Sequence, residues 1–395
     1  MGGLLDKGVP IAANHDVVVI GGGVIGLSVA VELRRAGVDR VVVLERDGAV
    51  GRASSSRANG GVRAQFSTAV NIAFSLHSIG EFERLTHAHP DVLTFHQRGY
   101  LFAAGRESGE NFLRQAAELQ LSMGVATRWL EPDEIVALAP IIERDGLRGG
   151  TWHARDGWLD PHGVIEVMRR EAKAAGAEIR LRSEVSAIAG RSGAEFQVVT
   201  SSGPVSARHV VNAAGAHART VGEMLGVEIP VTPVRRNLAF VRAPSTPSKP
   251  LPMCVDVDTG VLVRQEGEGY VIAYSNPNDE PGWDTSVDPR FLDDLADRIG
   301  GRFPSLESAP IDPRQCWAGL YPETEDHHAI VGESPEVPRF VQCVGFGGHG
   351  IMHAPAAGRA VAEIVTQGKC TSFDLHPLRP NRFDEGDLTV EAAII

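Results

Sequence analysis

Lysine and cysteine are scarce in this chain. Only four of its 395 residues are lysine and four are cysteine, and the formal net charge is −12. An acidic chain is a poor partner for nucleic acid or for an anionic membrane surface, so we expect neither. The cysteines form no C-x-x-C pair and no Cys/His metal spacing, so we expect no disulfide framework and no metal site. A reducing compartment is the simplest interpretation.

Long apolar runs are also missing. No stretch of the sequence approaches the roughly 20 apolar residues of a membrane-spanning helix. Residues 1–15 lack the basic and apolar regions of a secretory signal. We therefore expect a cytoplasmic protein, long enough for two domains around a large core.

The chain does contain a complete dinucleotide-binding pattern near its start. Residues 16–20 read as a buried strand, a helical pattern runs to about residue 36, and residues 41–44 form a second apolar strand. Between strand and helix lies G-x-G-x-x-G, formed by Gly21, Gly23 and Gly26. In this context the motif predicts adenine-dinucleotide binding, with a glycine-rich turn in an unrelated α/β fold as the alternative.

Each position of the motif has a physical role. The first glycine allows a tight turn, the second lets backbone approach a pyrophosphate, and the third lets helix pack closely on strand. The N-terminal N–H groups of the helix then face the phosphates. Glu45, nineteen residues after Gly26, is placed to accept from ribose hydroxyls. The motif alone does not identify the dinucleotide.

The periodicity changes near residue 231. Residues 235–241, 260–264 and 270–275 read as strands, with a hairpin turn at residues 267–269, and residues 290–300 read as a helix. The chain then returns to a strand at 340–344 and a helix from about Pro355 to Thr366. We predict an α/β fold in which a Rossmann-type domain is interleaved with a mostly antiparallel β-sheet domain.

Several further segments carry a family resemblance. They are SSSRANGGVR (54–63), DGWLDP (156–161), NAAGAHA (212–218), WAGLYPETED (317–326) and GFGGHGIMHAP (345–355). With them, the chain resembles FAD-dependent oxidoreductases of the D-amino acid oxidase superfamily, in particular the sarcosine oxidase beta subunit, proline dehydrogenase and glycine oxidase. The resemblance implies FAD rather than NAD. It also implies an FAD-binding domain made of residues 14–90, 150–232 and 312–383, a substrate domain made of residues 91–149 and 233–311, and terminal extensions at 1–13 and 384–395.

The resemblance, together with the motif, implies a set of cofactor-binding residues. They are Gly21, Gly23, Val24, Ile25, Gly26, Glu45, Arg46, Ser54, Ser55, Ser56, Arg57, Gly60, Gly61, Val185, Ala214, Gly215, Gly319, Gly347, Gly348, His349, Gly350, Ile351 and Met352. Arg57 supplies a cation for the pyrophosphate in this interpretation, and a surface arginine is the alternative. Gly319 occupies the position of the flavin-linking cysteine of monomeric sarcosine oxidases, and Cys316 lies three residues earlier. We therefore expect non-covalent FAD.

The resemblance also implies a reaction. It is hydride transfer to flavin N5 from a carbon that bears an amine, in an amino acid or secondary amine, with an imine as product. A substrate carboxylate needs a cation, and the candidates are Arg63, Arg235, Arg236 and Arg264. Arg63 corresponds best to the carboxylate-binding arginine of the sarcosine oxidase group, with a salt bridge inside the loop as the alternative.

Three more residues complete the predicted catalytic site. His349 is placed to tune the flavin or to shuttle a proton, unless it only bonds to backbone. Tyr274 and Tyr321 stand at active-site positions of the family, where either can line a pocket or pack in the core.

Departures from the relatives leave the electron acceptor and the kind of amine open. Val271 stands where sarcosine oxidases carry a lysine that helps oxygen accept electrons. Met352 replaces a carboxylate-binding lysine and Tyr321 replaces an arginine, so a larger, more apolar or non-carboxylate amine is an alternative substrate. We expect oxygen as the acceptor, with a dehydrogenase that passes electrons to a partner or quinone as the alternative. A 2-hydroxy-acid dehydrogenase and a flavin-bearing subunit of a hetero-oligomer also stay open.

Overall fold

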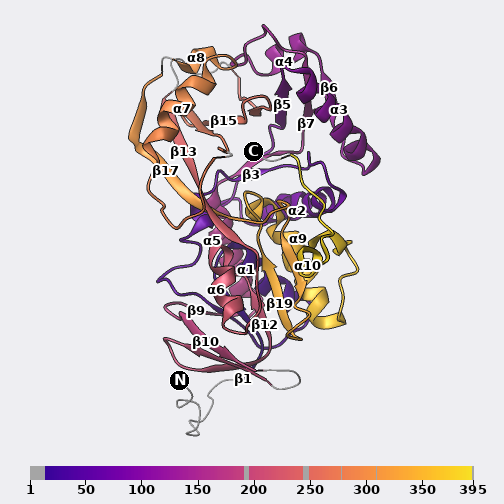
Figure 1. The fold of residues 1–395 in the computed structure, drawn as a ribbon, viewed down its shortest axis with the longest axis vertical. Coiled ribbons are helices and arrows are strands. Elements are labelled where there is room, and N and C mark those ends of the chain that lie inside the picture. The colour runs from indigo at the N-terminus through magenta and orange to yellow at the C-terminus, as the bar shows by residue number, and fades with distance from the viewer. Residues whose placement is uncertain (1–13, 191–194, 243–248, 277, 308, 394–395) are drawn as a thin grey trace.

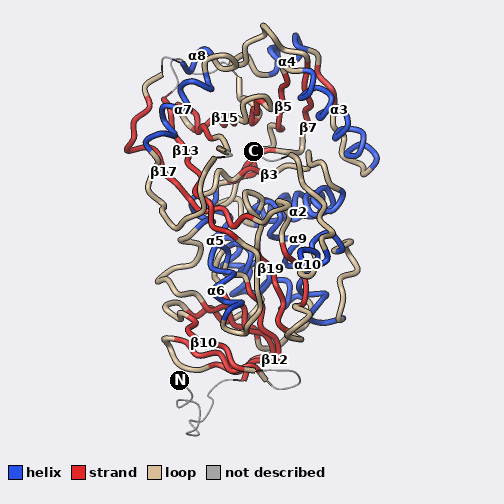
Figure 2. The backbone as a smooth tube through the Cα atoms, in the orientation of Figure 1, coloured by secondary structure: helices blue, strands red, loops and turns tan. Residues whose placement is uncertain are grey.

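The computed structural model describes residues 14–190, 195–242, 249–276, 278–307 and 309–393. Its chain forms two bodies that lie one above the other (Figure 1). The lower body holds β1, β12, β19, α1 and α9, and the upper body holds β5, β7, β15, α3 and α7 (Figures 1 and 2). The C-terminal segment, yellow in Figure 1, returns to the level between the two bodies.

The lower body is built on an eight-stranded sheet. Its strands are, in order, β10 (Val185–Ala189), β11 (Phe196–Thr200), β12 (Val205–Asn212), β1 (Asn14–Ile20), β2 (Val41–Leu44) and β9 (Glu178–Arg180), and β19 (Phe340–Val344) pairs with β12 and with β18 (Ile330–Glu333). β1 pairs in parallel with both β2 and β12. Val17 and Val19 belong to the core on one face of β1, and Val18 and Ile20 to the core on the other. A strand buried on both faces explains the unbroken apolar run in the sequence.

Helices cover both faces of this sheet. They are α1 (Val24–Arg35), α2 (Ala69–Ala88), α5 (Pro161–Ala174), α6 (Ala218–Glu223), α9 (Gly350–Gln367) and α10 (Arg382–Glu385), with 3-10 turns η1 (Ser54–Arg57), η2 (Gly215–His217) and η3 (His376–Leu378). The start of α5 is set by its sequence. The Asp160 carboxylate accepts from the His162 and Gly163 N–H groups, and Pro161 takes the first helical position.

The upper body is built on a second eight-stranded sheet. Its order is β17 (Ile311–Glu323), β13 (Thr232–Arg242), β16 (Gly269–Ala273), β15 (Val261–Glu266), β14 (Met253–Asp256), β5 (Tyr100–Ala104), β7 (Gly149–His153) and β6 (Arg128–Leu130). The β5–β14 pair is parallel, and the other neighbours are antiparallel. The helices of this body are α3 (Glu107–Ser122), α4 (Pro132–Leu138), α7 (Pro289–Ile299) and α8 (Pro304–Glu307). A small sheet of β3 (Gly61–Val62), β8 (Gly157–Leu159) and β4 (Phe95–His96) lies beside them.

The predicted fold class is confirmed, with differences at particular elements. β7 and most of β17 lie in segments that we assigned to the FAD-binding domain, yet both are strands of the second sheet. The last long helix begins at Gly350 and not near Pro355, so the proline lies inside it. Next to the proline, the Ala356 N–H donates to the Ser78 hydroxyl of α2 at 3.3 Å. A partner from α2 therefore supports the helix where proline weakens it.

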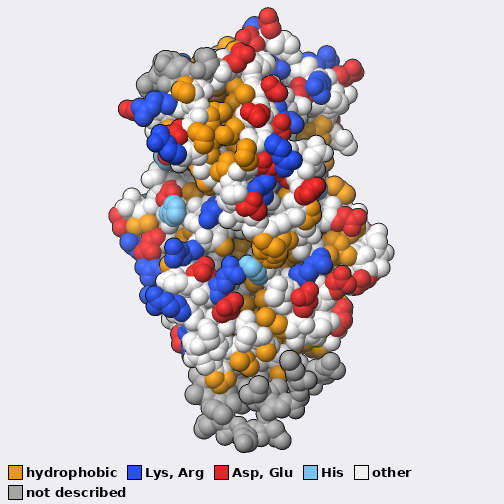
Figure 3. Space-filling view, turned by 60° about the vertical axis from the view of Figure 1, so that its left-hand side comes forward, with side chains coloured by type: hydrophobic (Ala, Val, Ile, Leu, Met, Phe, Trp, Pro, Cys, Tyr) orange, Lys and Arg blue, Asp and Glu red, His pale blue; other side chains and the backbone are white. Residues whose placement is uncertain are grey.

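On the side drawn in Figure 3, charged side chains of both signs and apolar side chains share the surface. In the part of the chain that the structure describes, no helix combines the length and the apolar character needed to cross a membrane.

Candidate active site

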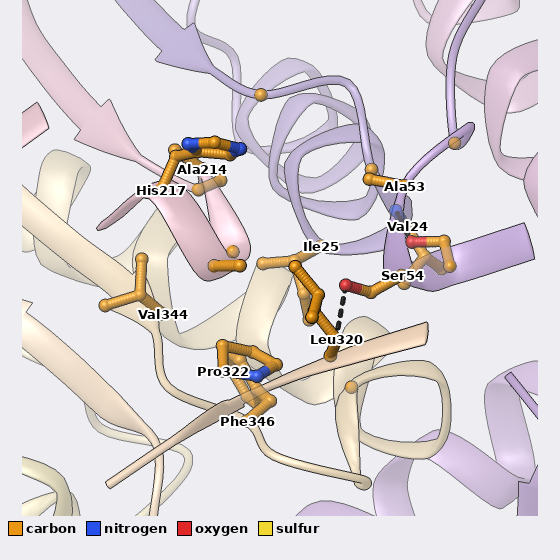
Figure 4. A pocket seen from close by; sticks show the side chains of 18 of the residues that line it. Val24, Ile25, Ala53, Ser54, Ala214, His217, Leu320, Pro322, Val344 and Phe346 are labelled. Atoms are coloured by element: carbon orange, nitrogen blue, oxygen red, sulfur yellow. Dashed lines mark hydrogen bonds between the residues drawn. The ribbon is translucent and has the colours of Figure 1, made fainter. Parts of the chain in front are cut away.

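A cavity of about 590 Å³ runs along the edge of the first sheet where β1 and β2 end. Its wall is built from the β1–α1 turn, η1, η2, β17 and the loop before α9. Figure 4 shows Val24, Ile25 and Ser54 on one side of it, with Ala214, His217 and Val344 on another. We call it the large cavity.

Gly21 makes the tight turn at the end of β1. Its φ is +108°, and a Cβ there would lie 2.4 Å from the Ala213 carbonyl oxygen. No other residue fits this conformation and this close approach. The predicted reason for the first glycine of the motif is therefore met in the structure.

Glu45 is held in place at the end of β2. One carboxylate oxygen accepts the Gly22 N–H at 2.8 Å, and the other accepts the Asp47 N–H at 2.8 Å. The residue lines the large cavity while keeping this fixed orientation. It is thereby oriented as an acceptor for hydroxyl groups of a ligand.

The η1 loop ties the two bodies together across the cavity. The Ser54 hydroxyl donates to the Leu320 carbonyl at 2.6 Å, which Figure 4 draws as a dashed line. Arg57 Nη1 donates to the Ala318 carbonyl at 2.6 Å. Arg57 lines the large cavity and reaches across to β17, so it is neither a free surface cation nor wholly available to a ligand.

The donor set and the shape of the large cavity fit FAD. Backbone of the β1–α1 turn, the N-terminus of α1 and the oriented Glu45 are the groups that a dinucleotide needs. Gly319, which also lines the cavity, has no thiol to link a flavin. Cys316 packs with the core of the upper body, and burial raises the pKa of Cys343, which lines the cavity. A thiol held protonated is a poor nucleophile, in agreement with non-covalent FAD.

A second cavity of about 70 Å³ adjoins the first, and we call it the small cavity. Both are lined by Ala58, Arg236, Leu238, Tyr321, Gly348 and Ile351. The small cavity lies where β13, β15 and β16 of the second sheet meet β3 and the loop before α9. The two cavities thus lie side by side and share part of their wall.

Most of the predicted cofactor residues line one of these cavities. Those on the large cavity are Gly21, Gly23, Val24, Ile25, Glu45, Arg46, Ser54, Ser55, Arg57, Val185, Ala214, Gly215, Gly319, Gly347, Gly348, Gly350 and Ile351. Gly60, Gly61, His349 and Met352 line the small one, together with Gly348 and Ile351. Gly26 and Ser56, both within the described residues, line neither. The binding roles of all these residues stay a prediction.

Arg63 lines the small cavity, but its guanidinium is engaged elsewhere. Its side chain is fully buried, Nη1 donates to the Gln65 carbonyl and Nη2 to the Ala393 carbonyl. The guanidinium carbon lies 3.8 Å from the centre of the Phe66 ring. Among the described residues, Arg63 forms no salt bridge of the kind that we considered. Its two terminal nitrogens already donate to carbonyls, so its guanidinium is not an open fork for a carboxylate.

His349 also lines the small cavity, at the N-terminus of α9. Its ring meets the Phe66 ring edge-on, with 4.9 Å between centroids. Burial, reinforced by the nearby Arg63 cation, lowers the pKa of His349 well below its usual value. The imidazole is therefore neutral at physiological pH, with a ring nitrogen that can accept a hydrogen bond. One turn later, His353 pairs with the Ser75 hydroxyl at 3.0 Å.

The two predicted tyrosines both reach the small cavity. Tyr321 lines both cavities, and burial raises the pKa of its hydroxyl while Arg236 opposes that rise. Tyr274 donates to the Asp294 carboxylate at 3.0 Å and stacks on Phe291. Tyr274 thus lines the pocket and packs in the core of the upper body at the same time.

The sequence did not single out some residues that the fold brings to these cavities. His217 and Trp283 stack with 4.4 Å between their centroids at the large cavity, and Trp283 comes from the loop between β16 and α7. No sequence signal links two residues that are so far apart in the chain. No group of three or more metal-ligating side chains is found among the residues that the structure describes.

Comparison with known proteins identifies the family of the chain. A family model for FAD dependent oxidoreductases, DAO, matches residues 16–364. FAD-dependent oxidoreductase domain-containing protein 1 of Bos taurus is 32% identical, over 97% of this chain and 87% of that protein. Mitochondrial dimethylglycine dehydrogenase of Homo sapiens is 28% identical over 95% of this chain, which spans only 45% of that protein.

Solved structures give the same picture. L-proline dehydrogenase from P. horikoshii superposes with a TM-score of 0.88 at 28% identity, over 95% of this chain and all of the other (100%). Glycine oxidase from Geobacillus kaustophilus gives 0.82 at 26% identity, over 94% and 99%. The predicted cofactor, FAD rather than NAD, is confirmed. Since the family model covers most of the chain, the protein belongs to the DAO family of FAD-dependent oxidoreductases.

Proposed function

We propose that the protein oxidises the C–N bond of an amino acid or secondary amine by hydride transfer to flavin N5, with an imine as product. The observation that carries the proposal is the small cavity, which shares part of its wall with the large one and is lined by the neutral His349. FAD, when bound, supplies the hydride acceptor. The chain's own residues have to bind the neutral amine and keep water away.

His349 is suited to holding the neutral amine. An amine gives up a hydride from its α-carbon only after losing the extra proton of its ammonium form. The neutral imidazole of His349, on the wall of the small cavity, offers a ring nitrogen that accepts a hydrogen bond from the amine. Leu238, Leu262 and Ile351 line the same cavity with apolar side chains and limit the water around the reacting carbon.

The names of similar proteins support the amine over other substrates. Dimethylglycine dehydrogenase, glycine oxidase and L-proline dehydrogenase are each named for an amino acid. A 2-hydroxy acid is the competing substrate, because the neutral His349 would accept a hydrogen bond from a hydroxyl as well.

Val271 favours an electron acceptor other than oxygen. Its buried side chain lies on β16, two residues before Ala273, which lines the small cavity. Alternation along a strand turns both side chains to the same face. A cation at this face would stabilise the charge that develops on oxygen, and valine offers none. We therefore propose the dehydrogenase form, with a partner or quinone as acceptor, ahead of the oxidase form that we expected.

Anaerobic bleaching of the flavin absorbance across a panel of amines, amino acids and 2-hydroxy acids tests the proposal. We expect amino acids or secondary amines to bleach it and hydroxy acids to leave it oxidised. With the best substrate, H349Q should lower the bleaching rate at pH 7. Bleaching by hydroxy acids alone would overturn the proposal.

A further inference from the structure

Residues 390–393, which we call the strap, lie against the start of α2. The strap belongs to no helix or strand, and its side chains alternate between outward and inward positions. Val390 is 58% exposed and Ala392 is exposed, whereas Glu391 and Ala393 are buried. Contacts of the two inward residues with other segments therefore fix the place of the strap.

Glu391 anchors the strap through a fully buried carboxylate. It accepts hydrogen bonds from the Ser67 N–H at 2.9 Å, the Ser67 hydroxyl, the Ala393 N–H at 2.9 Å, the Thr68 hydroxyl at 2.6 Å and the Asn71 side-chain amide at 3.0 Å. Burial raises the pKa of Glu391, but the hydrogen bonds from Ser67 and Thr68 more than offset that rise. The carboxylate is therefore charged at neutral pH.

The start of α2 favours an anion at this place. Thr68 is the N-cap of α2, its side chain makes no capping bond, and the first turn of the helix holds no acidic residue. The free N–H groups and the dipole of a helix N-terminus favour a negative charge. Glu391 supplies that charge from a position 323 residues away in the sequence.

Ala393, the other inward residue, accepts a hydrogen bond from Arg63. The Arg63 side chain is fully buried, and the acceptors of its two terminal nitrogens are the carbonyls of Gln65 and Ala393. Gln65 belongs to the same segment as Arg63, so the strap supplies the acceptor that comes from another part of the chain. A buried donor that loses its acceptor is costly, so the strap and Arg63 depend on each other.

Arg63 in turn contacts the ring that supports His349. Its guanidinium carbon lies 3.8 Å from the centre of the Phe66 ring, and the Phe66 ring meets the His349 ring edge-on at 4.9 Å. A cation over an aromatic face and two rings edge to face are both attractive arrangements. A series of direct contacts therefore connects the strap to His349 on the wall of the small cavity.

We propose that the strap fixes Arg63 beside the small cavity and that Glu391 is a positioning residue, which keeps Arg63 on Phe66 and thereby keeps His349 oriented. The effect of Glu391 on the reaction rests on the proposed function, whereas its effect on Arg63 does not. A short surface segment opens locally more readily than a core element does, and opening of the strap leaves Arg63 without the Ala393 carbonyl.

Chemical modification of arginine tests the strap without turnover. The FAD-loaded protein is treated with phenylglyoxal, and peptide mass spectrometry follows each arginine separately. Arg63 should be protected in the wild type and react only when the strap opens. E391A removes every bond to the carboxylate and should raise the modification rate of Arg63 by at least about tenfold. Arg264, buried on β15 in the upper body, should keep its wild-type rate.

Two matched variants make this result specific. V390A shortens the exposed neighbour of Glu391 on the same strap and should leave the modification rate of Arg63 within about twofold. E391Q keeps the length of the side chain and one carbonyl oxygen, so its rate should fall between those of the wild type and E391A. Equal rates at Arg63 in the wild type and E391A would overturn the inference.

Anaerobic flavin bleaching by the best substrate tests the positioning role. Compared at equal FAD absorbance, E391A should lower the limiting rate by about 10- to 100-fold, because small misplacements at a reacting centre are costly. R63M has no guanidinium for the strap to hold, so in that background E391A should change the limiting rate by less than about twofold. An equal loss in both backgrounds indicates a general structural role and would overturn the positioning role.

The proposed function fails by a different result, which is that no amine or amino acid bleaches the flavin. The modification rate of Arg63 still tests the strap in that case, so the two failures are separable.

Discussion

Gly348 gives the sharpest test of the geometry at the junction of the two cavities. A Cβ on Gly348 would lie 2.6 Å from Cε2 of Tyr321 and 2.9 Å from both Cζ and the hydroxyl oxygen. Real carbon contacts are about 3.5 Å or longer, so the Tyr321 ring has to move by nearly 1 Å. The ring forms part of the wall of both cavities.

We therefore expect G348A to lower the free energy of unfolding by about 1–3 kcal/mol, the usual cost of overpacking. G350A is the matched control in the same loop. A Cβ on Gly350 would lie 3.7 Å from Phe346 Cβ, an ordinary contact, and Gly350 is the first residue of α9. Alanine there should be neutral or stabilising by up to about 1 kcal/mol.

Guanidinium unfolding at a fixed excess of FAD measures both variants, and a double variant completes the test. In a Y321A background the clash is gone, so G348A should then cost less than about 0.5 kcal/mol. The reasoning is refuted if G348A costs the same in both backgrounds, or if G350A is as harmful as G348A.

Three other predictions follow from the site. V271K should raise the rate at which oxygen reoxidises the reduced enzyme by at least about tenfold, because a cation stabilises developing charge on oxygen. Stopped-flow reoxidation measures this rate, and an unchanged rate would contradict the role given to Val271. W283A should speed FAD release by about 2- to 12-fold, since the stack of Trp283 on His217 is worth about 0.5–1.5 kcal/mol. Fluorescence of the released FAD reports the rate. L121A, which removes an exposed side chain elsewhere, should leave the release rate unchanged. Burial lowers the pKa of His353, so below pH 6.5 the unfolded chain binds a proton that the native state does not, and stability falls as the pH falls. H353Q should make that fall shallower by up to about 1.4 kcal/mol per pH unit in unfolding curves between pH 6.5 and 5. An unchanged slope would place the proton uptake elsewhere.

The first βαβ unit is predictable because its signals are local. The expected strand at 41–44 is β2, and the expected helix after the glycines is α1. β17 is different, because its register with β13 depends on residues about 80 positions apart in the chain. Its 13 residues include prolines and charged residues that hide a strand pattern. The sequence places the start of α9 near Pro355, five residues too late, for a similar reason. The Ser78 hydroxyl that accepts the Ala356 N–H beside this proline comes from another helix.

The residues of the candidate site also fall into two groups: those that a local sequence pattern predicts, and those whose role depends on distant parts of the chain. The glycines and Glu45 were found because their spacing encodes their role. The state of Arg63 depends on the Ala393 carbonyl, 330 residues away, and no local pattern announces that bond. Of the other candidate arginines, Arg236 lines both cavities whereas Arg235 and Arg264 line neither, because their places in the second sheet depend on distant strands.

The central claim is that this fold oxidises a carbon that bears an amine. Its most direct test is the anaerobic rate of flavin bleaching by an N-methylated amino acid and by the same compound deuterated at the carbons bound to nitrogen, with the matching 2-hydroxy acid beside them. The account predicts bleaching by the amino acid, slower bleaching by its deuterated form, and none by the hydroxy acid. Bleaching by the hydroxy acid, with the flavin left oxidised by every amine and amino acid of the panel, would contradict it.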